Sequence, residues 1–322
     1  YLTSTRNGSH ETAWLAGAGG GHARRLGPAT GAMLAPDGQL VAVSQLTFNH
    51  QERSTLTLYS SSGAVAAAVF KGAASYQVTP VAWSPDSRYL AVNVLATDRS
   101  SPYRTGLYTV DASTGTVTPV AHGYIYGASF SPSASSPDEL VYALAHAQTY
   151  NSRVNLYTAA ADGTGPTSQL TRNGRSLNPL WATRGIVFDH ERIRGHNAPE
   201  YQITLVRGGH TITITYSRPN LLVQGLVPIA VSANGRRLLA MYQGQDTAFA
   251  WTVDLVTHRA RALKVHGKLV FPDGISRNGR RVLVDYGDFE EPPSAGTVYA
   301  MDFSGGHATA LVRHAGDAGW NQ

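Results

Sequence analysis

The residues with the greatest chemical capacity gather in one segment, Asp189-His-Glu-Arg-Ile-Arg-Gly-His-Asn-Ala-Pro-Glu200, which holds two histidines, two arginines and three acids. A histidine can act as a general base near neutral pH, and an arginine can pair with a carboxylate through two parallel hydrogen bonds. Cleavage of a uronic-acid polymer by β-elimination needs these functions: neutralisation of the carboxylate, a base, and an acid that is often Tyr. The same residues suit a surface that recognises a protein or glycan, and they are also typical of a solvated loop with internal ion pairs.

Other polar segments could supply partners for this one. The residues that we expect to serve catalysis, if the protein is an enzyme, are His146, Tyr150, His190 and His196. The residues that we expect to contact a ligand are His50, Arg53, Arg104, Arg153, Arg192 and Arg194. The enzyme hypothesis requires at least one His and one Tyr or Arg within roughly 8 Å of each other around a shared cleft.

Several kinds of site are disfavoured. The chain has no cysteine, which excludes disulfides, thiolate zinc sites and a cysteine nucleophile. His190 and His196 are six residues apart, which is not a recognised metal-ligand spacing. The glycine run Gly17–Gly21 joins two expected strands, so it does not resemble a phosphate-binding loop. We therefore expect no metal and no other cofactor.

Charge and hydropathy limit the partners. The net charge is +5, but the basic residues are mostly arginines scattered singly or in pairs such as Arg236-Arg237 and Arg280-Arg281. Proteins that bind nucleic acid usually cluster such residues, so we expect no nucleic-acid partner. A modest positive field suits an acidic polysaccharide and an anionic lipid surface equally. The longest apolar runs, such as Ala64–Phe70, are far shorter than the ~20 residues of a membrane helix. We expect a monomer without an integral membrane segment.

A repeat along the chain predicts the scaffold. Each copy has an apolar or aromatic anchor, a turn rich in Pro, Asp, Asn or Gly, and a short apolar strand. The anchors are Leu34, Trp83, Phe130, Trp181, Val231, Ile275 and Trp320, at intervals of 49, 47, 51, 50, 44 and 45 residues. A second half of each copy contains β-rich runs separated by Asp-Gly or Gly-Gly turns, which is the pattern of hairpins. This period is typical of a four-stranded propeller blade.

Counting the copies predicts an all-β, seven-bladed β-propeller of four-stranded antiparallel blades, with six blades as the alternative. The chain would form a single domain, 1–322. Residues 315–322 would supply the first strand of a blade whose other strands come from residues 1–26, so that both chain ends close the ring. The remaining blades are expected near 32–70, 80–121, 127–171, 178–216, 228–263 and 272–312. Trp83, Phe130 and Trp181 are expected to pack between blades.

The elements Trp83-Ser-Pro-Asp-Ser87 and Leu34-Ala-Pro-Asp-Gly38 resemble the WD40-like PD40 repeats of TolB-type propellers, with Asn234-Gly235 and Asn278-Gly279 as degenerate copies. The third copy departs through an insertion at Ser133–Asp138, and the fourth lacks Pro-Asp. The resemblance implies that the motif residues build the hairpin between the first two strands. It also implies an exported protein, secreted or in the bacterial envelope, that binds proteins or other ligands.

Propellers with related repeats include polysaccharide lyases for uronic-acid polymers, some of which hold a metal through His-x-His; this sequence has no His-x-His. A propeller places the connections between second and third strands on one face, where function often resides. The segments expected there are Phe48–Arg53, Thr97–Arg104, His146–Arg153, Asp189–Glu200 and Asp285–Ser294. Our leading hypothesis is an exported, non-catalytic module that binds a protein or glycan through this face. The alternatives are a polysaccharide lyase using His, Tyr and Arg from the same face, or a sensor or scaffold domain of a longer chain.

Overall fold

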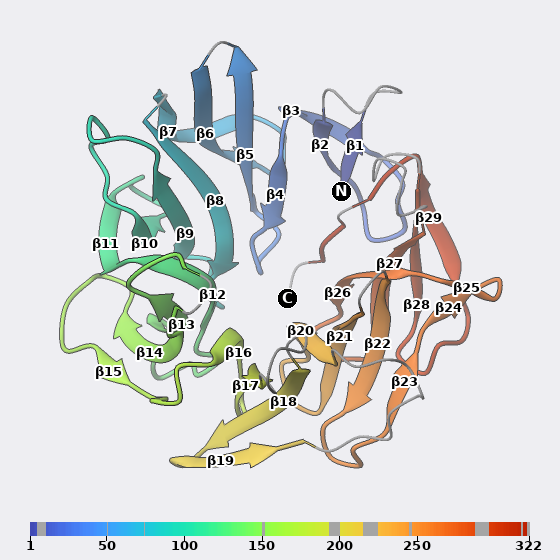
Figure 1. Cartoon of the computed structure of the whole chain (residues 1–322). Helices are drawn as coiled ribbons and strands as arrows, with labels where there is room; N and C mark the ends of the chain where they lie inside the picture. Colours follow the sequence, from blue (N-terminus) through green and yellow to red (C-terminus); the bar gives the residue numbers. More distant parts are fainter. Residues whose placement is uncertain are drawn as a thin grey trace.

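A computed structural model of the chain describes residues 1–4, 11–49, 51–73, 75–149, 152–192, 200–214, 225–244, 247–286, 296–316 and 318–320. The described residues form strands and turns without any helix, and therefore without a helix that is long and apolar enough to cross a membrane. Apart from one two-stranded hairpin, the described strands are arranged as seven sheets around a central axis (Figure 1). The fold is thus the predicted seven-bladed propeller, and the six-bladed alternative is excluded.

We number the blades in chain order. Blade 1 contains β1 (Leu2–Ser4), β2 (Glu11–Leu15) and β3 (Arg24–Pro28); blade 2 contains β4 (Gly31–Leu34), β5 (Leu40–Asn49), β6 (Gln51–Ser60) and β7 (Val65–Ala73). Blade 3 contains β8 (Tyr76–Trp83), β9 (Tyr89–Ala96), β10 (Gly106–Asp111) and β11 (Val117–His122). Blade 4 contains β12 (Tyr124–Phe130), β13 (Glu139–Ala145), β14 (Asn155–Ala160) and β15 (Ser168–Gln169).

The second half of the ring repeats this order. Blade 5 contains β16 (Ser176–Ala182), β17 (Gly185–Arg192), β18 (Glu200–Arg207) and β19 (His210–Thr213). Blade 6 contains β20 (Leu226–Val231), β21 (Arg237–Gln243), β22 (Ala248–Asp254) and β23 (Ala260–Ala262). Blade 7 contains β26 (Phe271–Ile275), β27 (Arg281–Tyr286), β28 (Thr297–Asp302) and β29 (Thr309–Arg313). A small hairpin that the repeat does not predict, β24 (Lys264–Val265) and β25 (Lys268–Leu269), connects blades 6 and 7.

The two chain ends meet in blade 1. Leu2 and Gly316 form an antiparallel bridge in which each backbone N–H donates to the other residue's carbonyl at 3.1 Å. The C-terminal segment therefore takes the inner position of blade 1, beside β1, and closes the ring as the sequence predicts. A cavity of about 140 Å³ lies at this closure, lined by Tyr1, Trp14 and Trp320 together with apolar residues of blades 2 and 7.

The core consists of seven clusters of buried apolar side chains, one at each contact between neighbouring blades. Trp83 lies in the cluster between blades 2 and 3, and its Nε1 donates to the Met33 carbonyl at 3.2 Å. Phe130 lies between blades 3 and 4, and Trp181 packs against the cluster between blades 4 and 5. The anchors of the repeat are thus packing residues, as predicted.

The repeated turn is stabilised by the same hydrogen bonds in its Asp and Asn forms. In blade 3, Asp86 Oδ1 accepts from the Ser84 hydroxyl at 2.6 Å and from the Arg88 N–H at 3.1 Å. In blade 6, Asn234 Oδ1 accepts from the Ser232 hydroxyl at 2.9 Å and from the Arg236 N–H at 3.1 Å. An amide oxygen replaces a carboxylate oxygen without loss of either bond, which explains why the repeat tolerates both residues.

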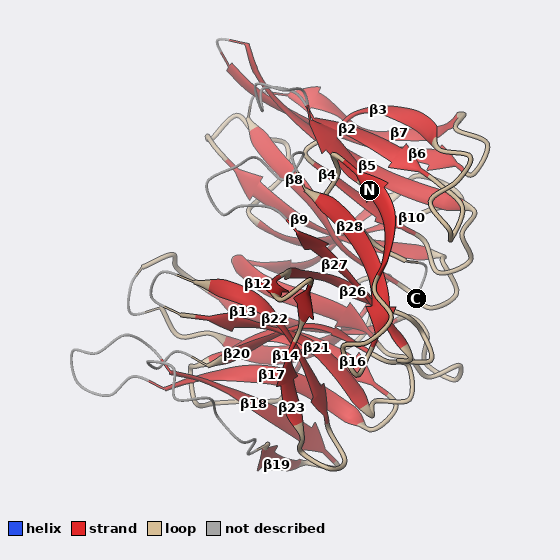
Figure 2. Ribbon diagram, turned by 90° about the vertical axis from the view of Figure 1, so that its right-hand side faces the viewer, coloured by secondary structure: helices blue, strands red, loops and turns tan. Residues whose placement is uncertain are grey.

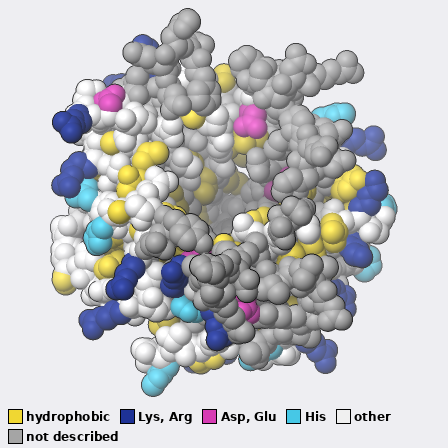
Figure 3. Space-filling view, in the orientation of Figure 1, with side chains coloured by type: hydrophobic (Ala, Val, Ile, Leu, Met, Phe, Trp, Pro, Cys, Tyr) yellow, Lys and Arg dark blue, Asp and Glu magenta, His cyan; other side chains and the backbone are white. Residues whose placement is uncertain are grey.

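The ring has two faces that carry different connections (Figure 2). We call the face with the second-to-third-strand connections and the blade-to-blade connections the loop face, and the opposite face, with the tight hairpin turns, the hairpin face. In the space-filling view the centre of the ring is hollow (Figure 3). Most inner strands carry a register shift, for example between Leu177 and Leu180 in β16, so their side chains do not alternate regularly toward this hollow.

Candidate functional site

The connection between blades 4 and 5 is fixed from both sides on the loop face. On the blade 4 side, Val154 N–H donates to the Gly174 carbonyl at 3.1 Å, and the Asn155 side chain accepts from Gly174 N–H at 2.9 Å. On the blade 5 side, Glu191 N–H donates to the Arg175 carbonyl at 2.9 Å. Residues 173–175 therefore form a rigid platform, although they lie outside any strand.

His190 lies against this platform. Its Nδ1 is 3.1 Å from the Arg175 carbonyl and 3.2 Å from the Asn173 amide nitrogen. Nδ1 therefore faces an acceptor, the Arg175 carbonyl, and a donor, the Asn173 amide, and can donate to the first or accept from the second. Burial lowers the pKa of His190, while the Arg175 carbonyl and the Glu191 carboxylate act in the opposite direction. The lowered pKa favours the neutral imidazole.

Arg175 and Glu191 form an ion pair beside His190. Arg175 Nη1 lies 3.0 Å from Glu191 Oε2, and both side chains are partly shielded from solvent. Arg192 is exposed at the end of β17, opposite Glu200 of β18. Opposite charges directly across a strand pair stabilise the hairpin modestly.

Asp189 is buried one residue before His190. Its Oδ1 accepts a 2.9 Å hydrogen bond from the Asn178 amide, and its Oδ2 is buried without a hydrogen-bond partner. Burial raises the pKa of Asp189 to about 6, although the bond from Asn178 opposes that rise. Asn178 reaches this position because it lies within the register shift of β16 with a φ of 48°, a conformation that Asn tolerates better than most residues.

Tyr201 completes the group from β18. It pairs with Glu191 across the strands, and burial, together with the charges of Glu191 and Asp189, raises its pKa. It therefore stays protonated at any physiological pH and can donate a hydrogen bond. The junction combines a neutral imidazole, a fixed ion pair, a buried carboxyl and a phenol within one blade.

Three of the predicted site residues come together here. His190 and Arg192 lie on β17, and the aliphatic stem of Arg153 packs on Gly174 of the platform, where a Cβ would lie 3.0 Å from Arg153 Cγ. Arg153 is itself exposed. The prediction that Asp189–Glu200 forms a loop is wrong at both ends, because Asp189–Arg192 belong to β17 and Glu200 begins β18.

The other predicted residues lie elsewhere or outside the described residues. His146 is exposed in the connection after β13, and Arg53 is exposed on β6 and not in a loop. Arg104 is exposed in the connection after β9, which is fixed because Tyr108 Oη accepts from Arg104 N–H and donates to the Arg104 carbonyl, both at 2.9 Å. His50, Tyr150, Arg194 and His196 lie outside the described residues.

Sequence reasoning missed Asn173, Arg175 and Asn178. Asn173-Gly174 has the composition of a tight turn, and Asn178 precedes a proline; neither pattern distinguishes a structural turn from a site. Within the described part of the chain, no group of three or more His, Asp or Glu side chains is arranged to hold a metal ion.

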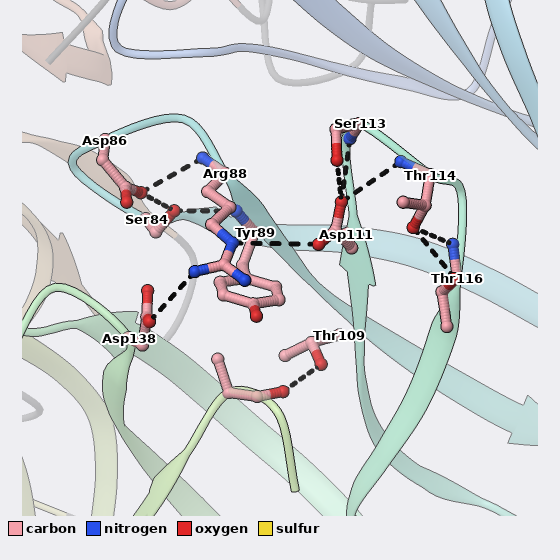
Figure 4. A network of polar contacts seen from close by, with 11 residues as sticks. Ser84, Asp86, Arg88, Tyr89, Thr109, Asp111, Ser113, Thr114, Thr116 and Asp138 are labelled. Atoms are coloured by element: carbon pink, nitrogen blue, oxygen red, sulfur yellow. Dashed lines mark hydrogen bonds and ion pairs between the residues drawn. The ribbon is translucent and has the colours of Figure 1, made fainter.

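A second polar network lies on the hairpin face, between blades 3 and 4 (Figure 4). Arg88 lies 3.8 Å from Asp111 and 3.6 Å from Asp138, with its guanidinium 4.7 Å from the ring centre of Tyr89. Burial raises the pKa of Asp138, as do Asp86 and Asp162, and Arg88 opposes this effect. Half of the Arg88 side chain is exposed, so this network contributes little to stability.

The sequence matches no protein-family model and no curated protein. The structure is similar to TolB from Acinetobacter baumannii, at 16% identity and a TM-score of 0.55, over 85% of this chain and 60% of that one. It is similar to a prolyl endopeptidase, at 15% identity and a TM-score of 0.67, over 97% of this chain and 49% of that one. It is also similar to an oligogalacturonate lyase in complex with manganese, at 15% identity and a TM-score of 0.60, over 95% of this chain and 85% of that one.

The chain thus spans 60% of the length of that TolB and about half of that endopeptidase. At these identities the likeness concerns the fold. The chain is a seven-bladed propeller whose fold is similar to that of the TolB structure.

Proposed function

We propose that this chain is a non-catalytic binding module, and that it engages a protein or glycan through the loop face at the junction of blades 4 and 5. The observation that carries the proposal is the platform 173–175, which is hydrogen-bonded on both sides and flanked by the exposed guanidinium groups of Arg153 and Arg192. A rigid platform lowers the entropic cost of binding because few side chains have to be ordered.

The chemistry of the platform suits recognition of polar groups of both signs. The two exposed arginines can pair with carboxylates, and His190 Nε2 can accept or donate a hydrogen bond according to the tautomer. Arg175 is already paired with Glu191, so it orients the platform and adds little net charge. An extracytoplasmic location is part of this proposal and follows from the resemblance to TolB-type propellers.

The test is capture of ligands by the purified chain from a glycan array and from an envelope extract. Arg153→Ala and Arg192→Ala should each weaken capture about tenfold, the loss expected for one charge-assisted contact. Arg25→Ala is the matched control, because Arg25 is exposed on β3 of blade 1, away from the platform. Capture that is unaffected by either platform substitution would refute the site.

A lyase is the second candidate, favoured by the neutral His190 beside Arg175 and by the fold likeness to the oligogalacturonate lyase. In that reaction a base removes the proton at C5 of a uronate, and the C4–O bond breaks to leave a C4–C5 double bond. Incubation with polygalacturonate should then raise the ultraviolet absorbance, and His190→Gln should abolish the rise. A flat absorbance with a panel of uronate polymers would remove this candidate and leave the binding module.

A further inference from the structure

The hairpin face of blades 5, 6 and 7 carries a set of arginines that lie far apart in the sequence. They lie in the turns between the first and second strands of three neighbouring blades, or at the first residue of the second strand. We call this set the arginine arc; its members are Arg184, Arg236, Arg237, Arg277, Arg280 and Arg281. Residues separated by up to about a hundred positions thus share one surface, because the ring places equivalent turns of successive blades side by side.

Direct contacts join the three turns. The Thr183 hydroxyl donates to the Ala233 carbonyl at 3.1 Å, and the Arg184 stem packs on Gly235, which links blades 5 and 6. Ala233 N–H donates to the Arg277 carbonyl at 3.0 Å, and Arg237 Nη1 donates to the Gly279 carbonyl at 2.9 Å, which links blades 6 and 7. The arc is therefore continuous and held by its backbone.

Most guanidinium groups of the arc face solvent. Arg237 is half-buried and lies 4.9 Å from the ring centre of Phe303, whereas the other five arginines are exposed. None of the ion pairs formed among the described residues joins an arc arginine to a carboxylate.

The two nearby carboxylates are engaged within their own turns. Asp254 accepts from the N–H groups of Val256 and Thr257, and Asp302 lies 2.6 Å from His307 Nδ1. Burial would raise the pKa of Asp254, but those hydrogen bonds and the charge of Arg236 lower it overall. The arc therefore keeps a strong positive excess.

Another sector of the hairpin face, on blades 3 and 4, has the opposite sign. Asp86, Asp111 and Asp138 lie around Arg88 (Figure 4), and Asp162 is close enough for its charge to raise the pKa of Asp138. A planar anionic membrane that touched the arc would also approach this acidic sector and be repelled. A narrow, linear polyanion can follow the arc and avoid the acids.

We propose that the arginine arc binds a linear acidic polysaccharide through its carboxylate or sulfate groups. Arginine recognises such planar or tetrahedral anions through paired N–H donors. Single-stranded nucleic acid would need aromatic side chains on which bases stack, and the ring of Phe303 at the arc already lies against Arg237. The arc lies on the face opposite the platform of blades 4 and 5, so this proposal does not rest on the function proposed above.

The test is titration of fluorescently labelled heparin and polygalacturonate at low salt, with neutral pullulan as the reference polymer. The variant Arg236→Gln/Arg280→Gln should bind at least one acidic polymer about tenfold more weakly, and its affinity should fall less steeply with salt. Both side chains are exposed and only their backbone atoms take part in turn bonds, so the melting temperature should not change.

The matched control is Arg25→Gln/Arg99→Gln, which removes the same charge from β3 and from the connection after β9, at exposed residues outside both the arc and the platform. An unchanged affinity in this control supports the arc, whereas an equal loss in both variants would show a net-charge effect and overturn the proposal. Tighter binding of single-stranded DNA, duplex DNA or phosphatidylglycerol vesicles than of either acidic polysaccharide would also overturn it. Failure of both acidic polymers to bind leaves the loop-face proposal intact, because that proposal predicts loss of capture in the platform variants only.

Discussion

The side-chain amide of Asn178 donates a 2.9 Å hydrogen bond to Oδ1 of Asp189, while Oδ2 of the same carboxyl group is buried without a partner. A buried carboxylate with half of its acceptors unused is costly to ionise. Blade 5 thus holds a titratable group whose charge state changes in the physiological range.

Asp189→Asn should stabilise the protein at pH 7.5. Because the folded-state pKa of about 6 lies above the unfolded value near 4, the folded wild type binds more protons between these pH values and loses stability as the pH rises through them. The total loss in the free energy of unfolding is on the order of 2–3 kcal/mol. An Asn at position 189 removes this loss, and its side-chain oxygen can still accept the hydrogen bond from Asn178. Urea denaturation at pH 4.5 and 7.5 measures the effect; a variant as pH-dependent as the wild type would contradict it.

A second prediction concerns Ser87, which occupies a left-handed conformation (φ 62°) where the equivalent turns have Gly38, Gly235 and Gly279 (φ 74°, 64° and 69°). Its hydroxyl also accepts from Asp37 N–H at 3.0 Å. Ser87→Ala loses the hydrogen bond and keeps the strain, whereas Ser87→Gly loses both. Ser87→Gly should therefore be about 1 kcal/mol more stable than Ser87→Ala by chemical denaturation. Equal stabilities would mean that the backbone at this turn is unstrained.

The third prediction compares two buried tryptophans. Trp83 Nε1 donates to the Met33 carbonyl, but Trp251 Nε1 is buried without a partner. Replacement by Phe removes a hydrogen bond only at Trp83, and at Trp251 it removes an unsatisfied donor. We expect Trp83→Phe to cost about 1 kcal/mol more stability than Trp251→Phe, since both lose similar apolar area. The reverse order of stability in urea denaturation would show that the shape of the side chain, and not its hydrogen bonding, determines the stability at these two sites.

The fourth prediction concerns the ring closure. Gly316→Pro removes the N–H that donates to the Leu2 carbonyl, so it should lower the melting temperature through a loss of about 1–3 kcal/mol. Gly319→Pro is the control, because Gly319 is exposed and a side chain there would meet open space. Equal melting temperatures for the two variants would show that the bridge does not hold the ring.

The scaffold could be predicted from the sequence because each of its elements has a local signal. The anchors recur at intervals of about one blade. In the turns, the Asp or Asn side chain accepts hydrogen bonds from the preceding Ser hydroxyl and from the backbone N–H two residues later. The closure followed from counting, since the strands left over at the two ends add up to one blade. The hairpin β24–β25 was missed because its strands have two residues each, too few to show a period.

The candidate site could be predicted only in part. Asp189–Arg192 were expected in a loop because the apolar run Ile186–Phe188 gives way to charged residues, but pairing with β18 extends the strand regardless of polarity. The contact of Asn178 with Asp189 depends on a register shift, and the platform depends on two neighbouring strands. Neither feature has a signature in the residues themselves.

The arginine arc is another feature that could not be predicted from the sequence. Arg236-Arg237 and Arg280-Arg281 are ordinary pairs in the sequence, where they indicate no clustering. The ring brings them together because equivalent turns of neighbouring blades touch through Arg237 and Gly279. A charge pattern along the chain is therefore a poor guide to a charge pattern on a closed, repeated fold.

The contact between blades 7 and 1 affects the order in which the blades unfold. Among the residues that the structure describes, it holds the smallest of the seven apolar clusters, with four buried residues, beside the cavity of about 140 Å³ and the Leu2–Gly316 bridge. Amide protons of Leu2 and Gly316 should consequently exchange with deuterium long before those of β21 and β22, which are paired along their whole length. We expect unfolding to begin at this contact and to spread from blade to blade. The loop face of blades 4 and 5 would then be among the last parts of the protein to unfold.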